Sequence, residues 1–301
     1  MGWLNTSRLV IVAGKGGVGK TTVSAALAGA AAQRGHTVTA VTIGRSPLPH
    51  LLGCEVTPIH RILEEPTDAQ IRCATLDPQD ALASYLDENG LASLGRRMTR
   101  TGMLDLVATS TPGIKELLLL GRLRQVEQSE HTGVVIFDGP AAGHALALLR
   151  APAAMRDMAR SGRLLKQAEL ALAMLGDGQR SQVVLVTLPE HTPVAETIEA
   201  AFELEETVGV KLAPVVVNRC APASPPAVPP TSQLWPQLPN EIAGLIDHTL
   251  DADHERHELQ RTNIGALTER LGVPHIELPE AATRSGGVDL DALAATLEAG
   301  R

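Results

Sequence analysis

The chain has 301 residues, enough for about two domains of ordinary size or for one large α/β domain. Hydrophobic residues make up 44% and charged residues 20%, so neither a disordered acidic protein nor a fibrous one is expected. Two Phe, two Trp and one Tyr leave few rings to stack on bases, and the net charge of −8 provides no overall basic surface. The counts therefore predict no nucleic-acid partner.

The cysteines and the hydropathy pattern bear on where the protein acts. Cys54, Cys73 and Cys220 are odd in number and widely spaced, which indicates neither a disulfide framework nor a CxxC metal site. A reducing cytoplasm is the simplest setting for such thiols. No apolar run approaches the roughly 20 residues that a membrane-spanning helix needs. We therefore expect a cytoplasmic protein that is neither exported nor embedded in a membrane.

The N-terminal segment predicts a strand, a helix and a second strand. Residues 8–13 are apolar and predict a buried strand, which residues 14–20 follow as a glycine-rich turn. Residues 21–34 predict an Ala-rich helix, and residues 37–43 predict the next strand. This spacing is typical of a βαβ unit, in which the strands pair in parallel through a right-handed crossover.

Further short apolar runs predict more strands of the same sheet. They lack strict alternation of apolar and polar residues, as expected for strands covered by helices on both faces. The runs are 71–76, 134–137, 183–188, 213–217 and 275–278. The sequence therefore predicts an α/β fold, with a mainly parallel sheet flanked by helices.

We expect a single domain, 1–301, with two helical subdomain insertions at 77–131 and 151–178. Helical periodicity within the first insertion occurs at 80–87, 91–100 and 114–126. The second insertion contains a Leu- and Met-rich run that is more apolar than one packed helix face requires. That run either packs against the sheet as core or forms a flexible groove for a substrate or partner. Residues 221–239 contain seven prolines and predict a loop.

The strongest motif is a phosphate-binding loop at residues 14–22, which read GKGGVGKTT. It satisfies G-x-x-x-x-G-K-[ST] and lies between a predicted strand and a predicted helix, the context that this motif requires. Its backbone N–H groups would surround a phosphate at the helix N-terminus. Lys20 would contact the β- and γ-phosphates, Thr21 would ligate Mg²⁺, and Thr22 would reach the α-phosphate. The loop residues expected to bind nucleotide are Gly14, Lys15, Gly16, Gly17, Val18, Gly19, Lys20, Thr21 and Thr22.

An acidic residue completes the expected metal site. Asp138 directly follows the apolar run 134–137, which predicts a carboxylate at a strand end beside the phosphate loop. In P-loop ATPases this arrangement holds Mg²⁺ against the nucleotide. The sequence therefore predicts a P-loop NTPase fold, ATP and Mg²⁺ as cofactors, Thr21 and Asp138 as metal-site residues, and Lys20 and Asp138 as catalytic residues.

Two segments resemble one family of these ATPases. Lys15, directly after the first glycine, makes the loop similar to the deviant Walker A motif of the MinD, ParA and ArsA ATPases. Residues 138–150 read DGPAAGHALALLR and are similar to the switch II motif D-x-x-P-T-G-H-T-L-R-L-L of ArsA and of the eukaryotic tail-anchored-protein targeting ATPase. The resemblance covers nearly the whole chain and is strongest to bacterial "anion-transporting ATPase" proteins that are often encoded as pairs.

This resemblance implies an ATP-hydrolysing dimeric switch that couples its nucleotide state to a membrane-associated partner or a hydrophobic cargo. Lys15 would be a catalytic residue that reaches the phosphates bound by the other copy. Asn218 would bond the adenine edge, and Pro279 would close over the base. Without the resemblance, Lys15 could be a solvated surface charge and Asn218 a simple turn residue. The dimer would be a homodimer or a heterodimer with a paralogous ATPase.

The sequence departs from this family where an acid should orient the attacking water. Residues 41–52 read VTIGRSPLPHLL and contain no carboxylate, and Ser46 or His50 is the nearest polar substitute. Because phosphoryl transfer depends on a positioned water, we expect slow hydrolysis with ATP binding retained. The zinc-binding CxxC of the targeting ATPases is also absent. Two alternatives therefore stay open: a ParA/MinD-like positioning ATPase, and a catalytically weak nucleotide-binding subunit of a heterodimer.

Overall fold

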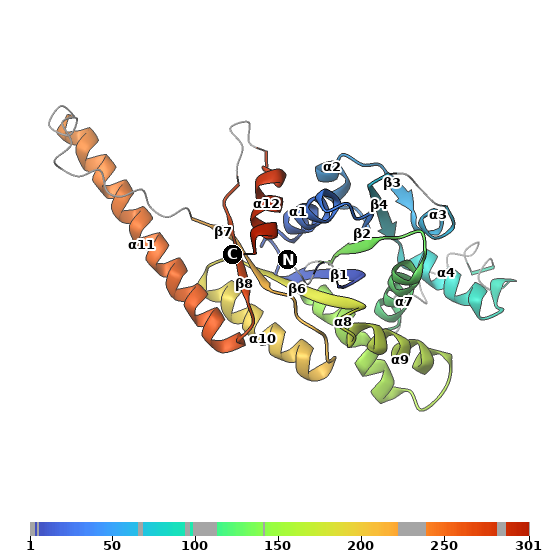
Figure 1. The fold of residues 1–301 in the computed structure, drawn as a ribbon. Coiled ribbons are helices and arrows are strands. Elements are labelled where there is room, and N and C mark those ends of the chain that lie inside the picture. Colours follow the sequence, from blue (N-terminus) through green and yellow to red (C-terminus); the bar gives the residue numbers. More distant parts are fainter. Residues whose placement is uncertain are drawn as a thin grey trace.

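A computed structural model describes residues 4, 6–65, 69–93, 97–98, 113–140, 142–221, 239–281 and 287–300. Within these residues, one eight-stranded parallel sheet has the order β3-β4-β2-β5-β1-β6-β7-β8. Helices cover both of its faces (Figure 1), so the predicted α/β fold is confirmed. The strands are β1 (Leu9–Gly14), β2 (Val38–Ile43), β3 (Val56–Pro58), β4 (Ile71–Leu76), β5 (Val134–Asp138), β6 (Ser181–Thr187), β7 (Val215–Cys220) and β8 (His275–Pro279).

The helices lie in two layers. On one face of the sheet are α1, α2 and α12, and on the other are α7, α8, α9 and α10 (Figure 1). Their bounds, with those of the peripheral helices, are α1 (Lys20–Gln33), α2 (Leu48–Leu52), α3 (Ile59–Glu64), α4 (Pro78–Glu88), α7 (Ile114–Gln128), α8 (Ala142–Met158), α9 (Arg163–Leu175), α10 (His191–Thr207), α11 (Asn240–Leu271) and α12 (Leu290–Ala299).

Strand β1 explains why the predicted strands are apolar without alternation. Leu9 and Ile11 belong to the core shared with α7, α8, α9 and α10, whereas Val10 and Val12 belong to the core under α1 and α12. All four side chains are buried. Because helices cover both faces of the strand, each of these positions has to be apolar.

The helices of the two predicted insertions pack on one another. Helices α4 and α7 lie at the predicted segments 80–87 and 114–126, and α7 contacts α4, α8 and α9. Half of the predicted helix at 91–100 and nearly all of the proline-rich segment 221–239 lie outside the described residues. The division of the chain into one domain with two insertions stays a prediction.

The apolar run within 151–178 is mainly core. It forms the end of α8 and the whole of α9, and on α9 the side chains of Ala168, Ala171, Met174 and Leu175 are buried. Met158 at the end of α8 is 78% exposed, and Leu170 is 37% exposed. The packing alternative therefore accounts for most of this run.

Several elements were not predicted from the sequence, namely β3, α2, α3, α10, α11 and α12. Strand β3 has three residues and pairs with β4 at the sheet edge. Helix α11 has 32 residues, and its C-terminal part packs beside α10 and buries Ile264 and Leu267. Its N-terminal part projects away from the sheet (Figure 1), where Leu245 is exposed. None of the helices in the described part of the chain combines the length and apolar character needed to cross a membrane.

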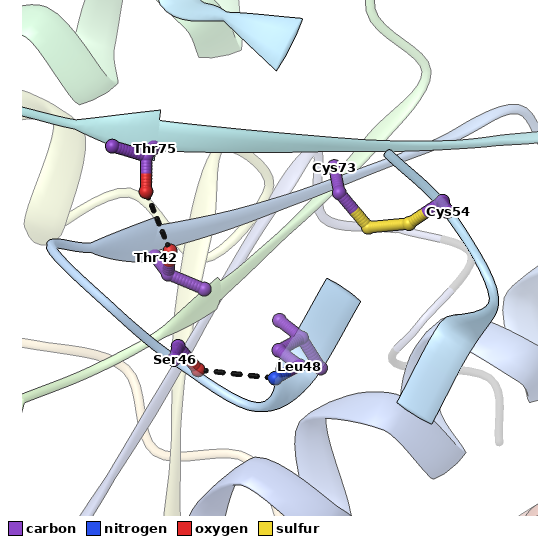
Figure 2. Close-up of a disulfide and its surroundings, with 6 residues drawn as sticks. All are labelled: Thr42, Ser46, Leu48, Cys54, Cys73 and Thr75. Carbon is purple, nitrogen blue, oxygen red and sulfur yellow. Dashed lines mark hydrogen bonds between the residues drawn. A yellow bond between two sulfur atoms is a disulfide. The ribbon is translucent and has the colours of Figure 1, made fainter. Parts of the chain in front are cut away.

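The expectation that the cysteines form no disulfide is wrong for one pair. Cys54 and Cys73 are joined by a disulfide, with their Cα atoms 6.1 Å apart (Figure 2). The cause is the pairing of β3 with β4, in which Val56 lies opposite Cys73 and so brings Cys54, two residues earlier, beside the same strand. Cys220 is a buried free thiol, and burial raises its pKa to about 12.

A buried ion pair joins α7 to the start of β6. The Arg180 guanidinium donates to both carboxylate oxygens of Glu127, at 3.2 Å from Nε and 2.7 Å from Nη2, and the Glu127 side chain is only 4% exposed. The hydrogen bond to Glu127 raises the pKa of Arg180, with burial acting in the opposite direction. Removing the arginine would leave a carboxylate buried without its cation.

We expect Arg180→Met to lower the free energy of unfolding by about 2 kcal/mol, because a charge buried without its counterion is costly. The measurement is urea denaturation followed by circular dichroism. Arg156→Met is the control, since Arg156 and Asp157 form an exposed pair and its loss should cost about 0.5 kcal/mol or less. Equal shifts in the two variants would contradict the expectation.

Candidate nucleotide-binding site

The predicted phosphate loop connects β1 to α1, as its motif requires. Gly17 and Gly19 have φ values of 85° and 91°, a left-handed conformation that favours glycine. A Cβ on Gly19 would also lie 2.2 Å from the side-chain nitrogen Nδ2 of Asn218. A Cβ on Gly16 or Gly17 would meet no atom of the described structure within 4 Å, so the protein leaves space beside the loop. That space and the N-terminus of α1 fit a phosphate group.

Lys20 is held inside this loop. Its side chain is buried, and its Nζ donates a 2.9 Å hydrogen bond to the backbone carbonyl of Lys15. Burial lowers the pKa of the Lys20 amine, and the charge of Asp138 offsets this effect only in part. An ammonium group in this position gains from an anion that enters the loop, so Lys20 is placed as the sequence predicts for a phosphate ligand.

Asp138 receives hydroxyl hydrogen bonds from both α1 and the segment after β2. Its Oδ2 accepts from Thr21 Oγ1 at 2.8 Å and from Ser46 Oγ at 3.3 Å, and its Oδ1 accepts from Ser24 Oγ at 3.1 Å. Burial raises the pKa of Asp138, while these three hydroxyl groups and the charge of Lys20 act to lower it. The carboxylate is buried at the end of β5, which pairs with both β1 and β2. The structure therefore brings the predicted residues Lys20, Thr21 and Asp138 together.

The oxygen atoms around Asp138 fit Mg²⁺, which prefers carboxylate, hydroxyl and phosphate oxygens. Neighbouring ligand oxygens of an octahedral Mg²⁺ lie roughly 3 Å apart, given metal–oxygen distances of about 2.1 Å. The separations from Asp138 Oδ2 to the Thr21 and Ser46 hydroxyl oxygens, 2.8 and 3.3 Å, lie on either side of this value. Thr21 and Asp138 thus stay our proposed metal-site residues.

Two of these hydroxyl groups were not assigned to the site from the sequence. Ser24 lies three residues after Thr21 on α1, so helical spacing alone could have placed both on the Asp138 side. Ser46 was named only as the nearest polar substitute for a missing acid. Its position depends on how the chain turns between β2 and α2, where Thr75 bonds both Thr42 and the carbonyl of Gly44 (Figure 2 shows the first of these bonds).

The predicted adenine residues line a separate small cavity. Thr22, Asn218 and Pro279 border a space of about 230 Å³, together with residues of α12 and of the segment before it. The Asn218 side chain is buried, and its Nδ2 donates to the carbonyl of Val18 at 2.9 Å. Asn218 therefore fixes the phosphate loop against β7 in addition to bordering the cavity. Its contact with a base stays a prediction.

Lys15 points to a different neighbour. Its Nζ lies 2.6 Å from Glu196 Oε1 on α10, and both side chains are more than 40% exposed. It borders a cavity of about 280 Å³ that also contains Glu199 and Leu146. An exposed ion pair of this kind is worth about 0–1 kcal/mol and exchanges readily. Lys15 is therefore accessible from outside the chain.

A larger cavity lies outside the phosphate loop. It measures about 810 Å³ and lies between the loop after β6 and α11, which contributes Gln260 and Asn263 to its wall. It shares Arg219 and Glu280 with the small cavity that contains Asn218. None of its lining residues belongs to the loop at 14–22, so its size does not identify it as the phosphate site.

Comparison with known proteins agrees with this geometry. The anion-transporting ATPase family model matches residues 7–170, which include β1, the phosphate loop and Asp138. "ATPase BagA" of Mycobacterium tuberculosis and "Putative ATPase Mb3704" of Mycobacterium bovis are each 30% identical over 323 residues, covering 97% of this chain and 93% of the relative. An "Arsenical pump-driving ATPase" of Escherichia coli is 31% identical over 199 residues, covering 65% of this chain and 32% of that protein. The chain therefore belongs to the anion-transporting ATPase family of ArsA-like proteins, and it is an ATPase.

Proposed function

We propose that this ATPase is a dimeric switch in which Lys15 of each copy contacts the nucleotide held by the other. The observation that carries the proposal is the difference in burial between two lysines of the same loop. Lys20 is buried within its own loop, whereas the Lys15 side chain is more than 40% exposed and is paired with the equally exposed Glu196. A phosphate brought by a second copy could replace Glu196 as the counterion of Lys15.

Within one copy, the loop would bind the ATP phosphates. Backbone N–H groups at the start of α1 and the Lys20 ammonium hold the phosphate oxygens, and Thr21 with Asp138 holds Mg²⁺. The bound ion would supply charge neutralisation at the β- and γ-phosphates. Thr22, the last residue of the loop, borders the small cavity, which would place the base near Asn218 and Pro279. The buried Asp138 is oriented beforehand by its three hydroxyl donors.

Hydrolysis by this chain alone is expected to be slow. The segment between β2 and α2 contains no acid to orient the attacking water, and removing a positioned catalytic group costs about 100-fold in rate. This absence favours one alternative, in which the chain is the catalytically weaker subunit of a heterodimer with a paralogous ATPase. Nothing on the described surface favours a positioning ATPase of the ParA/MinD type in the same way.

The switch would act in the cytoplasm, where ATP is supplied and where the Cys54–Cys73 disulfide would be exposed to reduction, and would drive a membrane-associated partner or carry a hydrophobic cargo. Support for such a partner comes from relatives named as arsenical pump-driving ATPases. Helices α7, α8 and α9 lie on the same face of the sheet as α10, which carries Glu196, and α10 packs against α8, so movement of α10 at the nucleotide site would be passed to them by direct contact.

Lys15→Ala tests the dimeric switch. We expect it to weaken ATP-dependent dimerisation at least about 10-fold, because a charge-assisted hydrogen bond across the interface is lost. ATP binding within one copy should stay near the wild-type value. The measurement is light scattering with a slowly hydrolysed ATP analogue and Mg²⁺, combined with isothermal titration calorimetry.

Lys211→Ala is the matched control, since Lys211 is also exposed but precedes β7 at the opposite end of the sheet. It should dimerise like the wild type. The role of Lys15 would be refuted if Lys15→Ala dimerised like the wild type, and a homodimeric switch would be refuted if the wild-type protein alone stayed monomeric with the analogue.

A further inference from the structure

The segment between β2 and α2 reaches the Asp138 carboxylate although it carries no acid. Ser46 Oγ lies 3.3 Å from Asp138 Oδ2, the oxygen that also accepts from Thr21 at 2.8 Å. These three side chains come from the segment after β2, the first turn of α1 and the end of β5. Three oxygen atoms from separate parts of the chain therefore meet at one point beside the phosphate loop.

The position of Ser46 is fixed by its surroundings. Thr75 on β4 bonds both the Thr42 hydroxyl and the carbonyl of Gly44, each at 3.0 Å, which holds the end of β2. On the other side, Ser46 Oγ accepts from the backbone N–H of Leu48 at 3.2 Å, and the Leu48 side chain is fully buried (Figure 2). The short turn that carries the hydroxyl is therefore anchored at both ends.

Capping of α2 alone does not account for both hydrogen bonds of Ser46. A cap needs only the side-chain oxygen as acceptor for a backbone N–H, and its hydroxyl proton is free to point to water. Here the proton points to a buried carboxylate. A hydroxyl oxygen has two lone pairs, and the bond from Leu48 uses one, so the other stays available for a cation.

We propose that the Ser46 hydroxyl oxygen is a direct ligand of the Mg²⁺ ion of the nucleotide site, together with Thr21 and Asp138. The inference rests on the proposed nucleotide site and adds to it a neutral oxygen ligand, which does not take over the water-orienting role of the missing acid. The hydroxyl cannot act as a base, so it would hold the ion and the first residue of α2 without activating water. This role fits a chain that binds Mg²⁺–ATP and hydrolyses it slowly.

The first test measures nucleotide affinity with and without Mg²⁺, using a fluorescent ATP analogue. In Ser46→Ala we expect the apparent affinity of the protein–nucleotide complex for Mg²⁺ to fall about 10-fold, as is common when a metal site loses a supporting group. The affinity for the nucleotide in the absence of Mg²⁺ should be unchanged. Ser46→Thr keeps the hydroxyl and should stay within about threefold of the wild type. An unchanged Mg²⁺ affinity in Ser46→Ala would overturn the proposal.

A second test separates metal ligation from helix capping by exchanging oxygen for sulfur. With Mg²⁺, Ser46→Cys should bind the nucleotide as weakly as Ser46→Ala. With Cd²⁺, Ser46→Cys should bind the nucleotide at least as tightly as the wild type does with Cd²⁺, because a thiol prefers softer cations. Ser24→Cys is the matched control, since Ser24 bonds the other Asp138 oxygen from within α1. It should show no selective gain with Cd²⁺.

The outcomes are distinct. If Ser46→Cys loses stability but keeps the wild-type ratio of Cd²⁺ to Mg²⁺ affinity, Ser46 is only a cap and the proposal is overturned. If the wild-type protein shows no Mg²⁺-dependent nucleotide binding at all, the proposed nucleotide site itself has failed. Thermal unfolding of each variant, compared with Ser46→Thr, identifies effects that come from folding alone.

Discussion

Replacing Lys20 by alanine is expected to weaken ATP binding about 100-fold and to abolish measurable hydrolysis. The Lys20 ammonium is buried in the free protein and bonds the carbonyl of Lys15 across the loop. It is therefore desolvated and positioned before ATP arrives, so its hydrogen bonds to phosphate oxygens should contribute strongly to binding. Loss of charge-assisted hydrogen bonds of this kind costs about 3 kcal/mol, which corresponds to about 100-fold in affinity.

Isothermal titration calorimetry with Mg²⁺ and ATP provides the measurement. Lys15→Ala is the control, because Lys15 lies on the same loop but should not contact the nucleotide of its own copy. Thermal unfolding should give a lower midpoint for Lys20→Ala than for Lys15→Ala, since Lys20 is buried near the Asp138 carboxylate and Lys15 is exposed, so affinities are compared at a temperature where both variants are folded. If Lys20→Ala and the wild type bound ATP with equal affinity, the nucleotide would have to bind elsewhere, for example in the cavity beside α11.

Breaking the Cys54–Cys73 disulfide is expected to lower the free energy of unfolding by about 3 kcal/mol. The two cysteines are 19 residues apart in the sequence, and a crosslink that closes a loop of this length restricts the unfolded chain by about that amount. The loop contains β3 and α3, which form the edge of the sheet, and α2 ends just before Cys54. Reduction should therefore affect this edge before it affects β1, which lies between β5 and β6.

Urea denaturation of the wild type with and without a dithiol reductant measures this effect. Cys54→Ser is the control, because it lacks the disulfide and its stability should not respond to the reductant. Cys54 is the better choice for substitution, since it is half-buried while Cys73 is 1% exposed. A wild-type protein whose stability is the same in both conditions would show that the crosslink does not stabilise the fold.

The parallel sheet and the phosphate loop could be predicted from the sequence because local signals specify them. Apolar runs such as that in β1 are covered on both faces, and the loop motif stands between a strand and a helix. Other elements gave weaker signals. Strand β3 has only three residues, and helix α11 has few buried positions along its 32 residues, so neither shows a clear hydrophobic period.

The sequence by itself determined the type of fold, the phosphate loop with Lys20, and the position of Asp138 directly after an apolar strand, because short-range patterns encode them. Only the tertiary structure decided which distant side chains meet. The strand order β4-β2-β5-β1 brings the segment of Ser46 to Asp138, and the β3–β4 pairing brings Cys54 to Cys73. Contact of Lys15 with Glu196 likewise depends on where α10 packs. Such contacts depend on strand order and packing, which local periodicity does not specify.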